Sequence, residues 1–261
     1  MEIPDLEIRA PSRGNRRLEA LLDAANGDRR LRAWWYMQQV NADRRDMSDH
    51  SWVHVQIVAN IALRLFRLLN RAGVQPAMVS SHGMKPRDAE VVIVAACLFH
   101  DTGMSIHRTD HEQYSLFLAA DRLPALLEGV YDEPELTVVT SEALHAVIGH
   151  RRRGDPITVE AGIVRVADAL DMASGRSRIP FETRRPNIHS ISAAAIDTVK
   201  IEPGDERAVR IEIAMNNSSG LFQIDELLAT KLRGSGIEEH VEVIAEISAE
   251  HEKRLVPVFR I

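Results

Sequence analysis

The sequence has little cysteine, few aromatic residues and a small net charge, and each of these features argues against a class of protein. Cys97 is the only cysteine among 261 residues, so neither an intrachain disulfide nor a cysteine-rich zinc site can form. Aromatic residues make up 5% of the chain, which offers no obvious platform for stacking bases. The net charge of −6 gives no support to a protein that coats nucleic acid or binds anionic membranes.

Apolar runs long enough to span a membrane are also missing. No stretch of 18 uncharged apolar residues occurs, and the first 20 residues lack the apolar core of a secretory signal. We therefore expect no membrane span and a cytoplasmic location. The composition, 45% hydrophobic and 27% charged, is ordinary for a soluble protein with a full core.

Apolar residues at helical spacing predict a helical first part of the chain. Ser48 or Asp49 could cap a helix over residues 51–70. The apolar run over residues 89–99 is rich in β-branched residues, so its composition fits either a buried helix or a buried strand. Further helices are predicted over residues 16–25, 31–40, 135–151 and 158–172.

Two local signals concern the region after this apolar run. Gly103 is typical of the residue that ends a helix. Thr109 with Glu112 fits a capping box, which predicts a helix reaching residue 121, followed by a shorter helical stretch from Pro124.

The pattern changes after Pro186. Apolar residues then alternate as in strands, and a Pro-Gly-Asp turn at residues 203–205 separates the first two of them. We expect an α+β protein with two domains, a helical one over residues 1–186 and a small α+β one over residues 187–261. The second domain should hold strands at 195–201, 209–215, 241–247 and 255–261, with one helix at 224–232.

The pair His100-Asp101 at the end of the apolar run is the most informative feature. Buried imidazole and carboxylate groups need partners, and a metal ion would supply one. Other helices carry further candidate ligands, and Asp168 stands out because it interrupts an apolar helix. A lone histidine is more often a packed residue, but the spaced set favours a metal site. The candidate metal ligands are His54, His100, Asp101, His111, His150 and Asp168.

The order H…HD…H…H…D over about residues 48–175 resembles the HD-domain superfamily of metal-dependent phosphohydrolases. The resemblance implies a helix over the ambiguous run. It also implies a first metal held by four ligands and a second held by two further histidines, with Asp101 bridging the two ions. The implied four are His54, His100, Asp101 and Asp168, and the implied further pair is His111 and His150.

Nitrogen and carboxylate ligands without thiolates suit one or two divalent ions of Fe, Mn, Zn, Ni or Co, and the sequence leaves the choice open. The implied activity is hydrolysis of a phosphate ester, with a nucleotide as the expected substrate and metal-activated hydroxide as the nucleophile. We expect Asp101 to be catalytic, together with His50, which lies one helical turn before His54. Whether the ester is a monoester or a diester stays open.

Basic residues near the predicted site could bind phosphate. Arginine forms bidentate hydrogen bonds with phosphate, although a solvated helix end explains a run of arginines equally well. The expected substrate-binding residues are Arg151, Arg152, Arg153 and Arg176, and Arg178 is a further basic residue near Arg176. The branch of the family that hydrolyses cyclic-di-GMP carries a lysine shortly after the doublet and a Gly-Tyr-Pro signature. Here Met104 takes the place of that lysine and no Gly-Tyr-Pro occurs, which argues against cyclic-di-GMP.

Two other functions stay open for the same ligand pattern. One is a di-iron oxygenase, and the other is a nucleotide-sensing regulator without catalysis. The expected partner is a small phosphorylated substrate rather than a membrane or a nucleic acid, and a homodimer is one candidate assembly.

Overall fold

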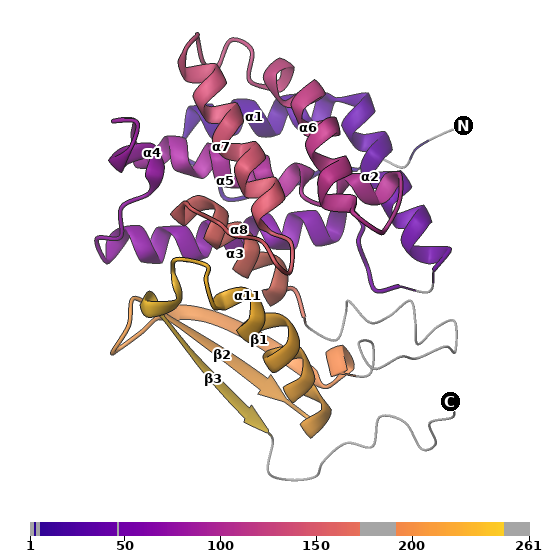
Figure 1. The fold of residues 1–261 in the computed structure, drawn as a ribbon, viewed down its shortest axis with the longest axis vertical. Helices are drawn as coiled ribbons and strands as arrows, with labels where there is room; N and C mark the ends of the chain where they lie inside the picture. The colour runs from indigo at the N-terminus through magenta and orange to yellow at the C-terminus, as the bar shows by residue number, and fades with distance from the viewer. Residues whose placement is uncertain (1–2, 4–5, 46, 173–191, 248–261) are drawn as a thin grey trace.

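A helical part and a small three-stranded sheet make up the fold in the computed structural model, which describes residues 3, 6–45, 47–172 and 192–247 (Figure 1). The expected α+β class is confirmed. The helices fill the upper part of the view, and the strands lie below them. The boundary expected near residue 186 and the strand expected over residues 255–261 lie outside the described residues.

Eight α-helices form the described helical part. Those predicted over residues 51–70, 135–151 and 158–172 are confirmed, with ends shifted by one or two residues. The short helix α4 was not predicted. The helices are α1 (Arg16–Gly27), α2 (Arg29–Asp43), α3 (Trp52–Arg71), α4 (Ala77–Ser80), α5 (Pro86–Phe99), α6 (His111–Leu126), α7 (Glu135–Gly149) and α8 (Val159–Leu170).

Helix α5 is the centre of the core. Every residue from Asp88 to Phe99 is buried, because α1, α3, α7 and α8 surround the helix. A helix that is apolar on all sides belongs in such a position, which explains why its sequence also fitted a buried strand. Trp35 of α2 donates its indole N–H to the carbonyl of Leu98 at 2.9 Å, so the last turn of α5 is fixed in place.

Helix α3 lies between the other helices and the sheet. Among the described helices, only α3 has the length and composition to cross a membrane. However, 56% of its 18 most apolar consecutive residues are buried inside the protein. It packs against α5 and α8 on one side and against the sheet on the other, where Arg64 donates to the carbonyl of Ile201. These contacts are those of a core helix.

Helix α6 differs from its prediction at both ends. The capping box of Thr109 and Glu112 is wrong, because Asp110 takes a left-handed conformation (φ 58°) and the helix begins at His111 without a side-chain cap. The helix also continues through Pro124 to Leu126 instead of ending near residue 121.

Gly103 is required by close packing and not by a helix stop. Helix α5 ends at Phe99, and Gly103 lies in the 3-10 turn η1 (Thr102–Ser105) that follows. A Cβ at this position would lie 1.9 Å from the carbonyl oxygen of His111. The Gly103 N–H donates to Ser115 Oγ, and that hydroxyl donates to the carbonyl of His100. The start of α6 is thereby held against the turn that follows the His-Asp doublet.

The sheet contains β1 (Ile196–Pro203), β2 (Val209–Met215) and β3 (Val241–Ile247) in the order β1-β2-β3. Strands β1 and β2 are antiparallel, with Ile201 opposite Ile211, and β2 pairs with β3 in parallel. Alternate residues of β2 are buried, as expected for a strand with one covered face. The three predicted strands that fall on described residues are confirmed.

A parallel pair needs a long crossover, and here it is helical. The predicted helix over residues 224–232 is observed as a π-helical segment, η4 (Gln223–Ala229), that runs into α11 (Thr230–Leu232). Both pack against α8. A Cβ on Gly162 of α8 would lie 2.0 Å from the carbonyl oxygen of Ser235, so the loop after α11 also touches α8 closely.

The close approach at Gly103 predicts a large loss of stability in Gly103→Ala. An added methyl group would force two backbone segments apart, and we expect a loss of about 2–4 kcal/mol in the free energy of unfolding. Denaturant unfolding in the presence of a chelator measures the change.

The matched control is Gly27→Ala, at the end of α1, where no atom lies within 4 Å of an added Cβ. This change should be neutral or slightly stabilising. Equal stability of Gly103→Ala and the wild-type protein would contradict the packing described here.

Candidate metal centre

The structure brings the six predicted ligands together at the meeting point of five helices. His54 lies in the first turn of α3, and His111 is the first residue of α6. His100 and His150 are the residues that follow the last turns of α5 and α7. Asp101 follows His100, and Asp168 lies in the last turn of α8. All except Asp168 are buried, and the side chain of Asp168 is 14% exposed.

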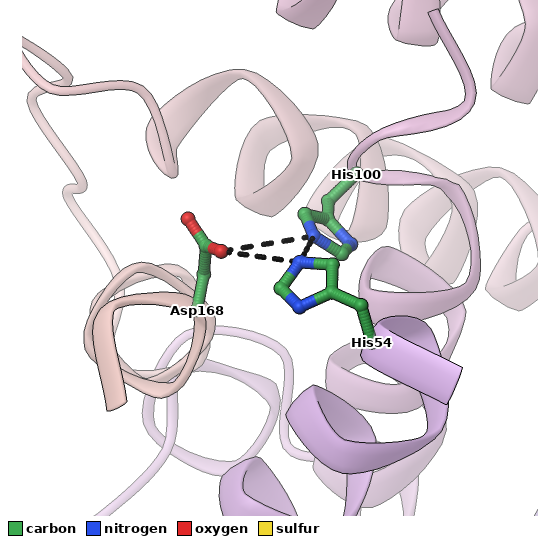
Figure 2. Close-up of side chains that lie close together, drawn as sticks. All are labelled: His54, His100 and Asp168. Atoms are coloured by element: carbon green, nitrogen blue, oxygen red, sulfur yellow. Dashed lines mark hydrogen bonds and ion pairs between the residues drawn. The ribbon is translucent and has the colours of Figure 1, made fainter. Parts of the chain in front are cut away.

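Three of these side chains form a first group around one point, which we call the first position (Figure 2). The Nε2 atoms of His54 and His100 lie 3.1 Å apart. Asp168 Oδ1 lies 3.4 Å from the His54 Nε2 atom and 4.0 Å from the His100 Nε2 atom.

The other three side chains form a second group, around the second position. Asp101 Oδ1 lies 3.0 Å from His111 Nε2 and 3.8 Å from His150 Nε2. The other oxygen of the same carboxylate, Asp101 Oδ2, lies 3.4 Å from His54 Nε2 and 3.5 Å from His100 Nε2. Asp101 therefore faces both positions, one oxygen to each.

Hydrogen bonds on the far side of the histidine rings fix which nitrogen faces each position. The Nδ1 atoms of His100 and His150 lie 2.8 Å and 2.5 Å from the carbonyl oxygens of Cys97 and Val147, three residues earlier in each case. A carbonyl can only accept, so Nδ1 carries the proton and Nε2 presents its lone pair. Metal-bound histidines in proteins commonly have this arrangement.

His54 is held in the same way by Asp171, whose Oδ2 lies 2.6 Å from His54 Nδ1. Two lone pairs, on His54 and His100, thus face each other at 3.1 Å. The two lone pairs repel each other unless one ring takes up a proton or a cation lies between the two nitrogens. Metal–nitrogen bonds of about 2.0–2.1 Å place neighbouring ligand atoms roughly 3–3.4 Å apart, close to the distances observed. The residues present therefore fit a divalent metal ion.

Asp171 was not identified from the sequence. It lies three residues after Asp168, and residues at this spacing share a helix face. That spacing was the available signal for a second carboxylate at the site.

The electrostatics of the site favour the protonation states that metal ligands need. Burial opposes ionisation of Asp101, but His100 and His111 outweigh it and hold the pKa of Asp101 well below its usual range. Burial likewise opposes ionisation of Asp168, and Lys231 and His54 lower its pKa well below the usual range. Both carboxylates are therefore ionised.

The surroundings shift the pKa values of three buried histidines in different directions. Burial, reinforced by the nearby His100 and Lys231, holds the pKa of His150 well below the usual range. Burial also lowers the pKa of His100. At His111 burial acts in the same direction, but the hydrogen bond and charge of Asp101 raise the pKa above the usual value. A proton on His111 Nε2 would lie where a cation at the second position would lie.

A cavity of about 430 Å³ opens beside the two positions. The predicted residues His50, Arg151 and Arg152 line this cavity, but Arg152 also pairs with Glu226 at 2.6 Å. Arg153 is exposed and is not among the lining residues. Arg176 and Arg178 lie outside the described residues.

Two basic residues of the cavity were missed in the sequence. Arg108 precedes α6 by three residues and reaches back to His111, with Nη1 lying 2.8 Å from His111 Nδ1. Lys231 comes from α11 and forms an ion pair with Asp168. The position of Lys231 depends on the packing of the C-terminal part against α8, which no local pattern of the sequence reveals.

The bond between Asp171 and His54 predicts that Asp171→Ala weakens metal binding without abolishing it. Loss of an acceptor behind a ligating histidine costs about 10–100-fold in metal affinity, because the ring loses its orientation. Competition with a fluorescent chelator measures this affinity. Asp23→Ala, which removes an exposed carboxylate of α1, is the control and should have no effect. Unchanged affinity in Asp171→Ala would show that the bond is not needed.

Comparisons with known proteins agree with this geometry. The family model described as HD domain matches residues 49–173, a range that includes all six candidate ligands. The chain is also 38% identical over 207 residues to the uncharacterised protein MJ1020 of Methanocaldococcus jannaschii, an alignment that covers 79% of this chain and 80% of the relative. The ordered ligands, their convergence and these two matches show that the chain belongs to the HD-domain family.

Proposed function

We propose that this protein is a metal-dependent phosphohydrolase that cleaves a phosphate ester of a small molecule. The observation that carries the proposal is the position of Asp101, which presents one oxygen to each of two groups of candidate ligands beside a cavity lined with both basic and acidic side chains. Two divalent metal ions at such a site would lower the pKa of a bound water and offset the charge that develops on phosphoryl oxygens.

The reaction adds water to the ester. A water oxygen forms a bond to phosphorus, the bond between phosphorus and the ester oxygen breaks, and the departing oxygen takes a proton. The chain's own task is to hold the phosphoryl group beside Asp101 and to move that proton.

Arg108 and Arg151 are the basic residues of the helical part that we assign to phosphoryl binding. Both line the cavity. His111 Nδ1 lies 3.1 Å from the carbonyl of Arg108 and 2.8 Å from its guanidinium, but a single Nδ1–H can only donate. When His111 Nδ1–H donates to this carbonyl, the guanidinium needs another acceptor, which either Glu112 of the same lining or a phosphate oxygen in the cavity can supply.

His50 is our candidate for proton transfer. It lines the cavity, and its ring centroid lies 5.7 Å from that of His54. Its Nδ1 lies 2.6 Å from the carbonyl of Ser48, so Nδ1–H donates there and Nε2 is the atom that exchanges a proton.

A nucleotide is the substrate that we test first. The cavity volume of about 430 Å³ lies in the range that suits small ligands. The described lining residues include no aromatic ring other than histidine, so a base would be bound by polar and aliphatic contacts. A panel of nucleotide and sugar monoesters and diesters, assayed with Mn, Fe, Ni and Co, defines the class.

Metal content and turnover together test the proposal. We expect about two metal equivalents in the wild-type protein, about one in His111→Ala and none in Asp101→Ala, because Asp101 serves both positions. Asp101→Ala should also lower kcat/KM by more than about a thousandfold. His82→Ala, a change at a pair with Glu142 away from the cavity, should leave both quantities unchanged.

Several results would contradict the proposal. Two bound metals without turnover of any ester in the panel would favour a sensor. An oxygen-dependent product without hydrolysis would favour an oxygenase. Full activity in metal-free protein would exclude the mechanism altogether.

A further inference from the structure

We infer that Lys231, from the C-terminal part of the chain, contacts the phosphoryl group of the substrate and completes the active site. The inference rests on the proposed function. It names a residue outside the matched HD range of 49–173 and gives the C-terminal part a role in catalysis.

Lys231 lies at the boundary between the ligand groups and the cavity. Its ammonium group pairs with Asp168 Oδ2, while the other oxygen of that carboxylate, Oδ1, faces His54 and His100. The lysine side chain is 13% exposed and lines the cavity. A group bound beside the two metal positions would therefore lie next to this ammonium.

The backbone around Lys231 is anchored to α8 by Arg165. The Arg165 guanidinium donates to the carbonyl of Lys231 at 2.9 Å and to that of Thr230 at 3.2 Å. The same guanidinium donates to carbonyls of the loop after α7, among them that of Arg151 at 3.3 Å. Arg165 is 3% exposed and lies three residues before Asp168. One buried side chain thus holds two cation-bearing segments, those of Lys231 and Arg151, at the cavity.

The donor count of the ammonium leaves capacity for a ligand. A lysine ammonium has three N–H donors, and the bond to Asp168 uses one of them. The helical part contributes Arg108 and Arg151 to the same lining, together with the carboxylate of Glu112. An anionic group between them and Lys231 would receive charged hydrogen bonds from both parts of the chain, which is the arrangement that a phosphoryl group requires.

Two charged residues of the C-terminal segment form separate ion pairs with the helical part. Glu226 of η4 pairs with Arg152 at 2.6 Å, which joins the segment to the loop after α7. Lys231, one to two turns later, is directed to Asp168 instead. The first contact is largely exposed to solvent, and the second places a cation at the cavity.

Lys231→Met tests the inference, because methionine keeps much of the side-chain volume without the charge. The variant should keep the metal content of the wild-type protein. Its metal-loaded form should bind inorganic phosphate at least about tenfold more weakly by calorimetry, and its kcat/KM should fall at least about a hundredfold. Lys231→Arg should recover part of both. Lys200→Met, which changes an exposed lysine of β1, is the matched control and should resemble the wild type.

The possible outcomes separate this inference from the proposed function. Unchanged phosphate affinity and kcat/KM in Lys231→Met would overturn the inference while leaving hydrolysis in place. Loss of metal in Lys231→Met, or a wild-type protein that binds no phosphate, would also overturn it. Phosphate binding that depends on Lys231, in a wild-type protein that hydrolyses no ester, would support the inference and overturn the proposed function.

Discussion

The structure around the candidate centre depends on one constraint, which is that the Asp101 carboxylate is shared between two groups of ligands. Its Oδ2 atom lies 3.4 Å from His54 Nε2, and its Oδ1 atom lies 3.0 Å from His111 Nε2. A buried carboxylate with histidine nitrogens on both sides needs N–H donors or positive charge on each side. The turn after α5, which carries Asp101, is packed closely. Gly103 and Ser115 hold that turn against α6, and any displacement would alter the distances from Asp101 to both groups.

Five helices have one end at the candidate metal centre, and the direction of each helix determines which end of its dipole faces the centre. Helices α5, α7 and α8 end at the site and α3 and α6 begin there, so three negative and two positive ends of helix dipoles face the place where a cation would bind. The ends of α5 and α7 supply the carbonyl acceptors of Cys97 and Val147, which orient His100 and His150. The backbone of the bundle thus fixes the tautomers of two candidate ligands, while the opposing helix ends largely offset one another.

Much of the centre could be predicted from the sequence because its ligands lie at recognisable places in helices. Asp168 interrupts an apolar helix, and His100-Asp101 closes another, so each called for a partner. The sequence left the choice between helix and strand open for α5, because burial on all sides removes the periodicity that distinguishes them. The capping box of Thr109 was a wrong prediction because Asp110 takes a left-handed conformation and the helix begins one residue later than expected. Lys231 could not be found at all, because only the docking of α11 on α8 brings it to Asp168. The parallel pairing of β2 and β3 was equally hidden, as strand patterns alone do not give direction.

Anomalous X-ray diffraction from crystals grown with manganese tests the central claim most directly. Two manganese peaks should appear, about 3.5–4 Å apart, with one Asp101 oxygen bound to each. One peak should lie among His54, His100 and Asp168, and the other between His111 and His150. A single ion, or two ions that do not share Asp101, would contradict the account.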